Sequence, residues 1–527
     1  MISNHFFSRY GLALVMQQNS LTSIENISPK MLTTLIEEGM NHFRLQPNKE
    51  DNEIIEFRFA KHSFLSENPK YISKHCNEGF FLSPNALTKD VAATNNWKAM
   101  LKIKDLLEKK TDFNKSEKAT MSIIPLTSKF NNGRMTQSPP TSSFFETCLC
   151  MITTSTPDKP SLHLIETQSN GVKSYIPTAI IPDLELSDLI KFITIFKEMK
   201  RTQTKKLMIG SIKRENKKVI YIRPRISFGN FPYAPSKRRE LAGAALLGAI
   251  GWWAKQAEYP NTNAEEVLEK LKQRPMYIVS YGKAQSVTYN HYVVELAKSN
   301  ELNTIIDALE RISVYASDEK SWKNVQQKRD TFFLFASRFL QLFDKQSFSQ
   351  FISIRGEYPE ELILLIKTYY RRVMKIEQNL IESAFALGQW LNRISFFSAC
   401  SELNIDPKNK GQVKANYKEL SKQKAKVLVE LESAAFSAKT STALVSQVIT
   451  RAGRISGQDA PNDSQSFIQA VIAGKLGETE KESLENSKNM IVVFSRIRSS
   501  REEPTIELVE QEKDEIEEIQ LSEEEQE

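Results

Sequence analysis

The stretch TYYRRVMKIEQNLIESAFALGQWLNRISFFSACSE at 368–402 carries apolar residues at positions i, i+3, i+4 and i+7. This spacing is typical of an amphipathic α-helix, and we expect a long helix to begin just after Met374. The same period resumes further along, at 411–439, 440–453, 463–474 and 478–499. The sequence therefore predicts an all-α bundle of four or five helices from roughly 374 to 500.

Before about residue 300 the apolar period is 2 rather than 3.6, which indicates strands. Three segments read as pairs of strands around polar turns, at 161–177, 205–226 and 276–297. The run at 241–253, LAGAALLGAIGWW, lies in an apolar helix expected at about 237–258, and its small residues favour close backbone packing against the sheet. We therefore predict a mixed or antiparallel sheet.

These patterns predict an α+β chain of several domains, because 527 residues exceed one ordinary core. The expected parts are a mixed N-terminal domain with antiparallel hairpins over 1–300, connecting helices over 301–373, an all-α helical bundle over 374–500 and a disordered acidic tail over 501–527.

The charge is unevenly distributed along the chain. The formal net charge is +7, but the segment 502–527 holds thirteen acidic residues and one lysine, Lys513. The remaining chain carries 70 basic and 51 acidic residues, a surplus of +19. A surplus of this size favours a polyanionic partner. The alternative interpretation is a solvated basic surface.

The cysteines and apolar runs indicate a cytoplasmic protein. Four cysteines in 527 residues form no disulfide framework, which suits a reducing compartment. Cys148 and Cys150 fit no zinc spacing, and we expect them as buried thiols on a strand. The 13 residues of 241–253 fall short of the ~20 that span a bilayer. No metal or cofactor is expected.

Familiar catalytic motifs are missing from the sequence. It contains no phosphate-binding G-x-x-x-x-G-K-[ST] loop, no dinucleotide-binding G-x-G-x-x-G, no H-E-x-x-H and no G-x-S-x-G. We therefore expect no enzyme activity. Because catalytic residues can assemble from distant positions, an enzyme with a site split across the chain stays open as an alternative.

Three segments carry candidate nucleic-acid contacts. The first segment is 221–256, in which Arg223 and Arg225 alternate on a predicted strand and Asn230 could offer its amide to a base edge. A helix start follows in the same segment and carries three cations, which oppose the helix dipole: Lys237, Arg238 and Arg239. That cluster fits either an external anion or a solvated first turn. The segment 129–143 reads as an exposed polar loop that contains Asn131, Asn132, Arg134 and Gln137.

The third segment is a lysine-rich helix expected at 408–426. Lys410, Lys414, Lys418 and Lys422 recur at i, i+4, which lines one helix face and favours contact with a phosphate backbone. Arg451 and Arg454 add a predicted basic loop. The alternative is a solvated face that Glu419, Glu430 and Glu432 balance.

Together these segments resemble the large subunit of type I CRISPR surveillance complexes (Cascade), particularly the I-B and Myxan-like forms. The resemblance rests on SFGNFPYAPSKRRELAGAALLGAIGWW at 227–253 and on the helical region from Leu380 to Arg454. It implies a non-catalytic protein that binds crRNA and reads the PAM in double-stranded target DNA. It also implies the other Cascade backbone subunits, a small subunit and a recruited helicase-nuclease as partners.

The resemblance also suggests roles for parts of this chain. The C-terminal bundle is similar to the Cascade small subunit, which in several I-B systems is also made from an internal start, and Met374 stands where such a start would serve. Alternatively, Met374 is an ordinary helix residue. We expect PAM contact from Asn131, Asn132, Arg134 and Gln137, with Asn230 and Arg223 as second choices, and backbone contact from the basic residues of the bundle. A stand-alone basic DNA- or RNA-binding protein without a guide is the competing interpretation.

Overall fold

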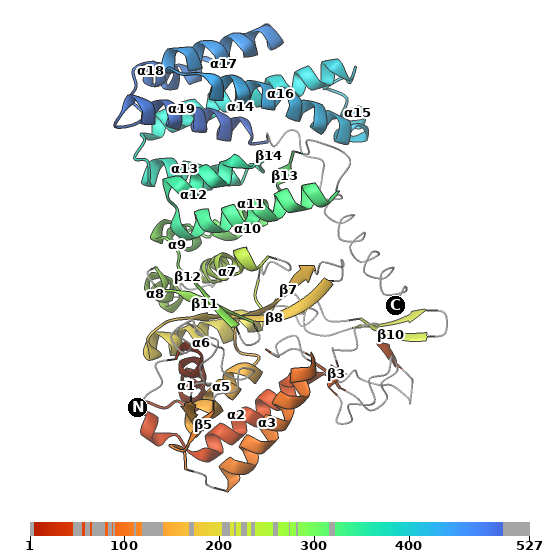
Figure 1. Cartoon of the computed structure of the whole chain (residues 1–527), viewed down its shortest axis with the longest axis vertical. Coiled ribbons are helices and arrows are strands. Elements are labelled where there is room, and N and C mark those ends of the chain that lie inside the picture. Colours follow the sequence, from red (N-terminus) through yellow and green to blue (C-terminus); the bar gives the residue numbers. More distant parts are fainter. Residues whose placement is uncertain are drawn as a thin grey trace. The chain divides into compact units, whose positions relative to one another are not determined.

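The structure is a computed structural model of the whole chain, drawn in Figure 1. It describes residues 5–45, 55–57, 64–65, 80–82, 87, 90–109, 112–118, 141–167, 173–202, 211–215, 218–222, 229–232, 238–256, 262–272, 274–280, 283–315 and 322–498. The chain divides into two compact units, Met1–Asn303 and Thr304–Glu527. The predicted α+β class is confirmed, while the acidic tail lies outside the described residues.

The first unit combines helices with short sheets. Its α-helices are α1 (Phe6–Gln18), α2 (Pro29–Phe43), α3 (Asp90–Glu108), α5 (Phe144–Ser155), α6 (Leu186–Thr202), α7 (Ala242–Gln256), α8 (Thr262–Leu271), α9 (His291–Lys298) and α10 (Leu302–Glu310), whose last residues belong to the second unit; single 3₁₀ turns are η1 (Ile24–Asn26) and η5 (Arg239–Leu241).

A four-stranded antiparallel sheet has the order β12-β11-β8-β7. Its strands are β7 (Ser161–Thr167), β8 (Lys173–Pro182), β11 (Met276–Ser280) and β12 (Lys283–Val287). In the middle of the sheet, Ala179 pairs with Val279 and Ile181 with Tyr277. The hairpin predicted at 161–177 is confirmed. In the segment 276–297 both strands are present, but its last residues form α9.

The remaining strands form smaller sheets. β9 (Ser211–Glu215) and β10 (Lys218–Ile222) make the hairpin predicted at 205–226, and β2 (Ile55–Phe57) joins β10 in parallel. The other short strands are β1 (Arg44–Leu45), β3 (Phe64–Leu65), β4 (Phe80–Leu82), β5 (Ser116–Lys118) and β6 (Thr141–Ser143), in the pairs β1·β4, β3·β4 and β5·β6. The prediction of a mixed or antiparallel sheet therefore holds for the described strands.

Cys148 and Cys150 lie on a helix, so their prediction as strand residues is wrong. The Ser143 hydroxyl oxygen accepts from the Glu146 N–H, and the Glu146 carboxylate accepts from the Ser143 N–H, which starts α5 with a capping box. Nine of the twelve helix residues are buried. A helix that is buried on nearly every side shows no 3.6-residue polar pattern, which explains the misprediction. Both thiols are buried, as expected.

The glycines of α1 and α7 mark close contacts between helices. An added Cβ on Gly11 of α1 would lie 2.1 Å from the Leu149 carbonyl oxygen of α5. An added Cβ on Gly251 of α7 would lie 1.7 Å from the Ala297 carbonyl oxygen of α9. Only glycine fits such approaches. The helix predicted at about 237–258 is therefore present, but two of its glycines pack closely against the backbones of α9 and α10 rather than against the sheet as predicted.

The second unit is mainly helical. Its elements are β13 (Ser313–Val314), α11 (Trp322–Leu342), α12 (Lys345–Ser353), β14 (Gly356–Glu357), α13 (Leu362–Arg372), α14 (Gln378–Glu402), α15 (Lys410–Ala415), α16 (Tyr417–Ser437), α17 (Ser441–Ser456), η6 (Asn462–Ser464), α18 (Gln465–Ile472) and α19 (Glu480–Ser495). Within residues 374–498 these make six α-helices, one more than predicted at most, because the segment 411–439 forms two.

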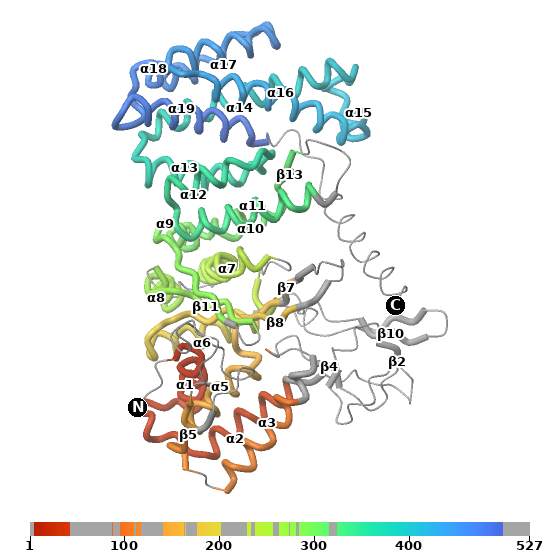
Figure 2. The backbone as a smooth tube through the Cα atoms, viewed as in Figure 1, coloured from red at the N-terminus to blue at the C-terminus, as the bar shows by residue number. Residues whose placement is uncertain are grey.

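Helix α14, which the opening sequence stretch predicts, packs against α16, α17, α18 and α19. These helices appear in blue and light blue in Figure 2. Gly388 lets α14 approach α19 closely, since an added Cβ would lie 2.4 Å from the Phe494 Cβ. Met374 lies just ahead of α14, in the short connection from α13, and the Tyr369 hydroxyl is 3.4 Å from its sulfur.

The residues before Met374 share an aromatic core. Phe348 stacks on Tyr369 with ring centroids 4.1 Å apart, and Phe351 stacks on Tyr358 at 5.5 Å. Tyr370 reaches Phe494 of α19 at 5.9 Å. These rings therefore pack part of the segment 301–373 against the bundle, within one compact unit.

Among the described helices, none is both long and apolar enough to cross a membrane.

Candidate nucleic-acid interface

Several exposed lysines lie where α14 leads into α15 and α16. Asn409 starts α15 by accepting hydrogen bonds from the backbone N–H groups of Gly411 and Gln412. Beneath this corner, Val413 and Leu420 pack with Cys400 of α14 in a small apolar cluster. This packing holds both short helical segments on the end of α14, and their polar faces point to solvent.

The lysines predicted to share one helix are divided between two. Lys408 precedes α15, Lys410 and Lys414 lie on α15, and Lys418 lies on α16; all four are exposed. The break falls at Asn416, which has φ −107° and ψ 17°. Its side-chain amide donates to the Gln412 carbonyl at 3.0 Å. Asparagine competes for main-chain carbonyls in this way and ends helices, so the prediction of one continuous helix over 408–426 is wrong.

Two charged residues of α16, Lys424 and Glu432, are buried. The ammonium of Lys424 lies 2.8 Å from the Glu357 carboxylate, with side chains 5% and 4% exposed. Burial by itself raises the pKa of Glu357, but Lys424 and Arg498 outweigh it and hold the pKa below its ordinary value. Glu432 is likewise buried, so it does not balance the exposed lysines.

Arg451 and Arg454 lie on a helix, not in the predicted loop. Helix α17 continues to Ser456 and ends at Gly457, whose φ of 65° is the left-handed conformation that favours glycine. Arg451 forms an ion pair with Glu430 of α16, at 2.7 Å between Nη2 and Oε1. Both side chains are about half exposed, so this pair contributes little to stability. Both arginines remain accessible on the surface.

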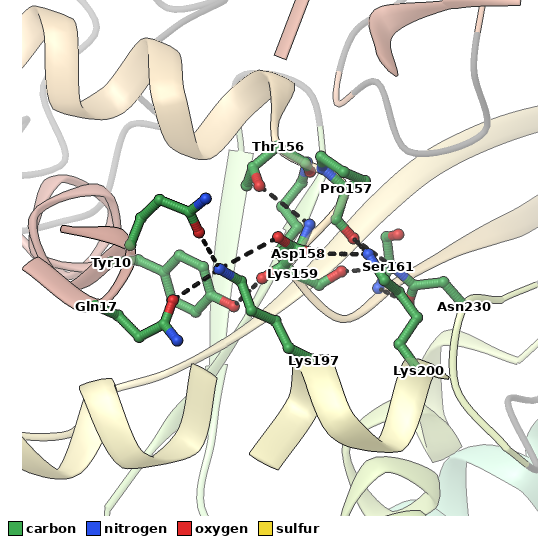
Figure 3. Close-up of polar contacts among 11 residues, drawn as sticks. Tyr10, Gln17, Thr156, Pro157, Asp158, Lys159, Ser161, Lys197, Lys200 and Asn230 are labelled. Atoms are coloured by element: carbon green, nitrogen blue, oxygen red, sulfur yellow. Dashed lines mark hydrogen bonds and ion pairs between the residues drawn. The ribbon is translucent and has the colours of Figure 1, made fainter. Parts of the chain in front are cut away.

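Asn230 is buried inside the first unit, which does not fit the predicted base contact. Figure 3 shows it among the residues of the turn between α5 and β7. Its side-chain oxygen accepts from the Ser161 N–H at 2.8 Å, and its NH₂ group donates to the Lys159 carbonyl at 2.7 Å. The side chain therefore fixes this turn, and we leave Asn230 out of the proposed base contacts.

An ionic cluster surrounds the same turn (Figure 3). Asp158 forms ion pairs with Lys197 and Lys200 of α6, and its backbone carbonyl accepts from the Tyr10 hydroxyl at 2.7 Å. Burial raises the pKa of Asp158, but Lys200 and Lys197 together lower it below its ordinary value. Lys197 also donates to Gln17 at 2.7 Å. These bonds tie the turn to α1 and α6.

Lys159 is completely buried beside this cluster. Its ammonium donates to the carbonyl of Thr154 at 3.1 Å and to that of Thr156 at 2.7 Å. These carbonyls end α5, where a cation or donor is favourable. Burial lowers the pKa of Lys159 to about 7, although Asp158 opposes this shift. This cluster was not predicted, because the turn sequence TPDKP at 156–160 gives only a weak signal for it.

The remaining candidates of the first unit are mostly outside the described residues. Arg238 and Arg239 are half-buried at the 3₁₀ turn that leads into α7, so their predicted position at a helix start is confirmed. Seven candidates cannot be placed, because they lie outside the described residues: Asn131, Asn132, Arg134, Gln137, Arg223, Arg225 and Lys237. Among the described residues, no group of three or more His, Cys, Asp or Glu could hold a metal ion.

A second buried ionic cluster, which was not predicted either, lies in the helical unit. Arg496 forms a bidentate pair with Glu432, at 2.7 Å from Nε and 3.1 Å from Nη2. It also donates to the Ile352 carbonyl at 2.6 Å. Burial lowers the pKa of Arg496, but Glu432 outweighs this and raises it. No local motif reveals this cluster, because its members are 64 and 144 residues apart.

Comparison with known proteins gives one family. A family model described as CRISPR-associated protein Csp2 matches residues 5–498. No curated protein matches the chain. The match spans both compact units and includes the exposed lysines of the bundle.

Proposed function

The chain belongs to the Csp2 family of CRISPR-associated proteins, and on this basis we propose that it is the non-catalytic large subunit of a type I Cascade complex. The family match over residues 5–498 carries this proposal, because it covers nearly all of both units. The I-B or Myxan-like subtype is part of the proposal. In such a complex the guide RNA reads the target sequence by base pairing, while the protein reads the PAM and the backbone.

The bundle supplies the proposed backbone contacts. Lys410, Lys414 and Lys418 are exposed at the α15–α16 corner, and Arg454 is exposed on α17. Arg451 can join them by leaving its exposed pair with Glu430, which costs little. Cations that neutralise phosphates release counterions and stabilise a bound strand without reading its bases. This surface therefore fits the target or the displaced strand of an R-loop.

The proposed PAM contacts come from the first unit. The polar side chains of Asn131, Asn132, Arg134 and Gln137 can bond base edges in a groove. Arg223 is the second choice. We assign Arg225, Lys237, Arg238 and Arg239 to the phosphate backbone near the guide handle. The protein carries out no cleavage in this proposal, and a recruited helicase-nuclease cuts the target.

We further propose that the bundle is also made alone from Met374. The position supports this, since Met374 lies between α13 and α14 and the bundle helices begin four residues later. Replacing Met374 by Leu should then abolish a C-terminal fragment of about 17 kDa on a blot, roughly 154 residues at the usual ~110 Da per residue. A fragment that persists would exclude this start.

Guide-dependent binding tests the main proposal against a stand-alone binder. The natively purified complex should bind duplex DNA only where one strand matches its RNA beside a PAM, and a complex loaded with a different guide should move to the new site. A scrambled duplex of equal length is the control. Equal affinity for matched and scrambled duplexes would favour the guide-free nucleic-acid-binding protein instead.

A further inference from the structure

The end of the bundle forms a strand pair with residues that precede Met374. The Tyr358 N–H donates to the Arg496 carbonyl at 2.8 Å, and the Arg498 N–H donates to the Tyr358 carbonyl at 2.9 Å. Tyr358 and Ile497 therefore make a parallel bridge beside β14. The extended residues 356–358 thus occupy an edge that residues 496–498 provide.

Side-chain charges select what occupies this edge. The Glu357 carboxylate lies 2.8 Å from the Lys424 ammonium and 3.3 Å from Arg498 Nε. The next residue, Tyr358, is fully buried, and its hydroxyl accepts from Arg496 Nη1 at 3.3 Å. The position before is Gly356, where an added Cβ would lie 2.9 Å from the Ser313 carbonyl oxygen. Glu357 and Tyr358 therefore contact the edge and its cations, whereas Gly356 faces β13.

The two sides of this contact lie on opposite sides of Met374. Lys424, Arg496 and Arg498 belong to the bundle, whereas Glu357 and Tyr358 lie upstream. The Glu432–Arg496 pair stays within the bundle. A chain that starts at Met374 therefore keeps the edge and its cations but lacks the carboxylate that pairs with Lys424 and Arg498. In such a bundle the Arg496 carbonyl and the Arg498 N–H also lose their main-chain bonds to Tyr358, so the edge is open to another extended segment.

We propose that the edge 496–498, with Lys424, is a docking slot in the separately made bundle for an extended segment of a partner subunit, in which a carboxylate residue precedes an aromatic one. This inference rests on the proposed internal start. Strand addition supplies affinity through main-chain hydrogen bonds, and the cations and the apolar surroundings supply specificity. Residues 356–358 of the full chain show the occupant's chemistry.

Cleavage of the full chain tests whether this contact holds without a covalent link. A protease site inserted between Met374 and Lys375, in the connection before α14, allows the folded protein to be cut. We expect the two fragments to co-elute in gel filtration. Glu357→Lys should weaken their association at least tenfold, because it places a cation against Lys424 and Arg498. Glu360→Lys is the matched control, since Glu360 is exposed on the same segment.

Separation of the unmutated fragments after cutting would overturn the proposal. Equal weakening of the fragment association by Glu357→Lys and Glu360→Lys would also overturn the proposal. The aromatic contacts alone would then hold the fragments together. If the Glu357→Lys chain does not fold before cutting, Glu357→Gln is judged by the same comparison with Glu360→Gln. The internal start at Met374 is tested separately, by the presence of the C-terminal fragment on a blot. The result of that blot does not change the outcome of the cleavage experiment.

Discussion

The exposed lysines on either side of Asn416 give the sharpest functional prediction. Lys414 on α15 and Lys418 on α16 are replaced together by glutamate in the purified complex. Because the break puts them on different helices, we expect each to contact its own phosphate, and their effects to add. Both positions are exposed, so the substitution leaves the apolar cluster at Val413 and Leu420 intact.

The expected magnitude follows from counterion release. Each lost phosphate contact flattens the plot of log K against log salt by about 0.9, so the double variant loses up to about 1.8. Raising salt from about 50 to 200 mM should then weaken the unmodified complex about 12-fold more than the variant. The affinity loss should be similar for matched and unmatched DNA, since phosphate contacts carry no sequence information.

The assay is fluorescence anisotropy with a labelled duplex over a salt series. The matched control replaces Lys475 and Lys481 by glutamate, because both are exposed near the α18–α19 connection and give the same change in net charge. The control should keep the unmodified slope. An unchanged slope in the Lys414/Lys418 variant, or equal flattening in the control, would refute the assignment of this corner to a phosphate backbone.

Three other predictions concern the buried clusters and the polar loop. Arg496→Met should lower the free energy of unfolding by about 3–5 kcal/mol in urea titrations, because the buried Glu432 then loses both short hydrogen bonds and keeps the longer 3.9 Å contact with Arg355. Adding Glu432→Leu should recover most of this loss, and a loss below about 1 kcal/mol would contradict the prediction. The pKa of Lys159 is about 7 in the folded protein and about 10.4 in the unfolded chain. Between these two pH values the unfolded chain binds more protons than the folded protein. The free energy of unfolding should therefore rise with pH from about 7 to about 10.4. Lys159→Met should flatten this rise in thermal melts, and parallel profiles would count against it. Asn131→Ala should weaken binding to PAM-bearing targets by about 1–3 kcal/mol, and an equal loss on PAM-less DNA would remove this loop from PAM contact.

Local sequence patterns predicted much of the fold because they reflect local physics. The hairpins at 161–177 and 205–226 followed from period-2 runs around polar turns. The small residues of α7 indicated close backbone contact, but the contacts are with α9 and α10 rather than with the predicted sheet. The amphipathic helix at the start of the bundle was equally readable. Helix α14 has both buried and exposed faces, which is the condition under which a 3.6-residue period is informative.

The failures have equally specific causes. Helix α5 was missed because burial on nearly every side removes its polar face. The break at Asn416 depends on one side-chain hydrogen bond, which charge spacing does not reveal. Lys424 and Glu432 look like surface residues in sequence, yet their partners Glu357 and Arg496 are 67 and 64 positions away. Long-range ion pairs of this kind leave no local pattern.

The candidate site was predicted only in part, because a sequence pattern shows surface charge but not the contacts of a buried side chain. Exposed lysines on helix surfaces are readable from composition and spacing, and the structure places Lys410, Lys414 and Lys418 at the surface of one corner. Asn230 was misread because an amide suits a buried turn as well as a base edge, and only the contacts with Ser161 and Lys159 distinguish the two.

The most direct measurement is the RNA that accompanies the protein. A tagged chain is purified from its native host under conditions that keep complexes intact, and the bound RNA is sequenced. The account predicts a discrete population of RNAs that share one repeat-derived handle and differ in their spacer part, together with partner subunits. A chain that purifies without RNA, or with fragments that sample all cellular transcripts equally, would contradict it.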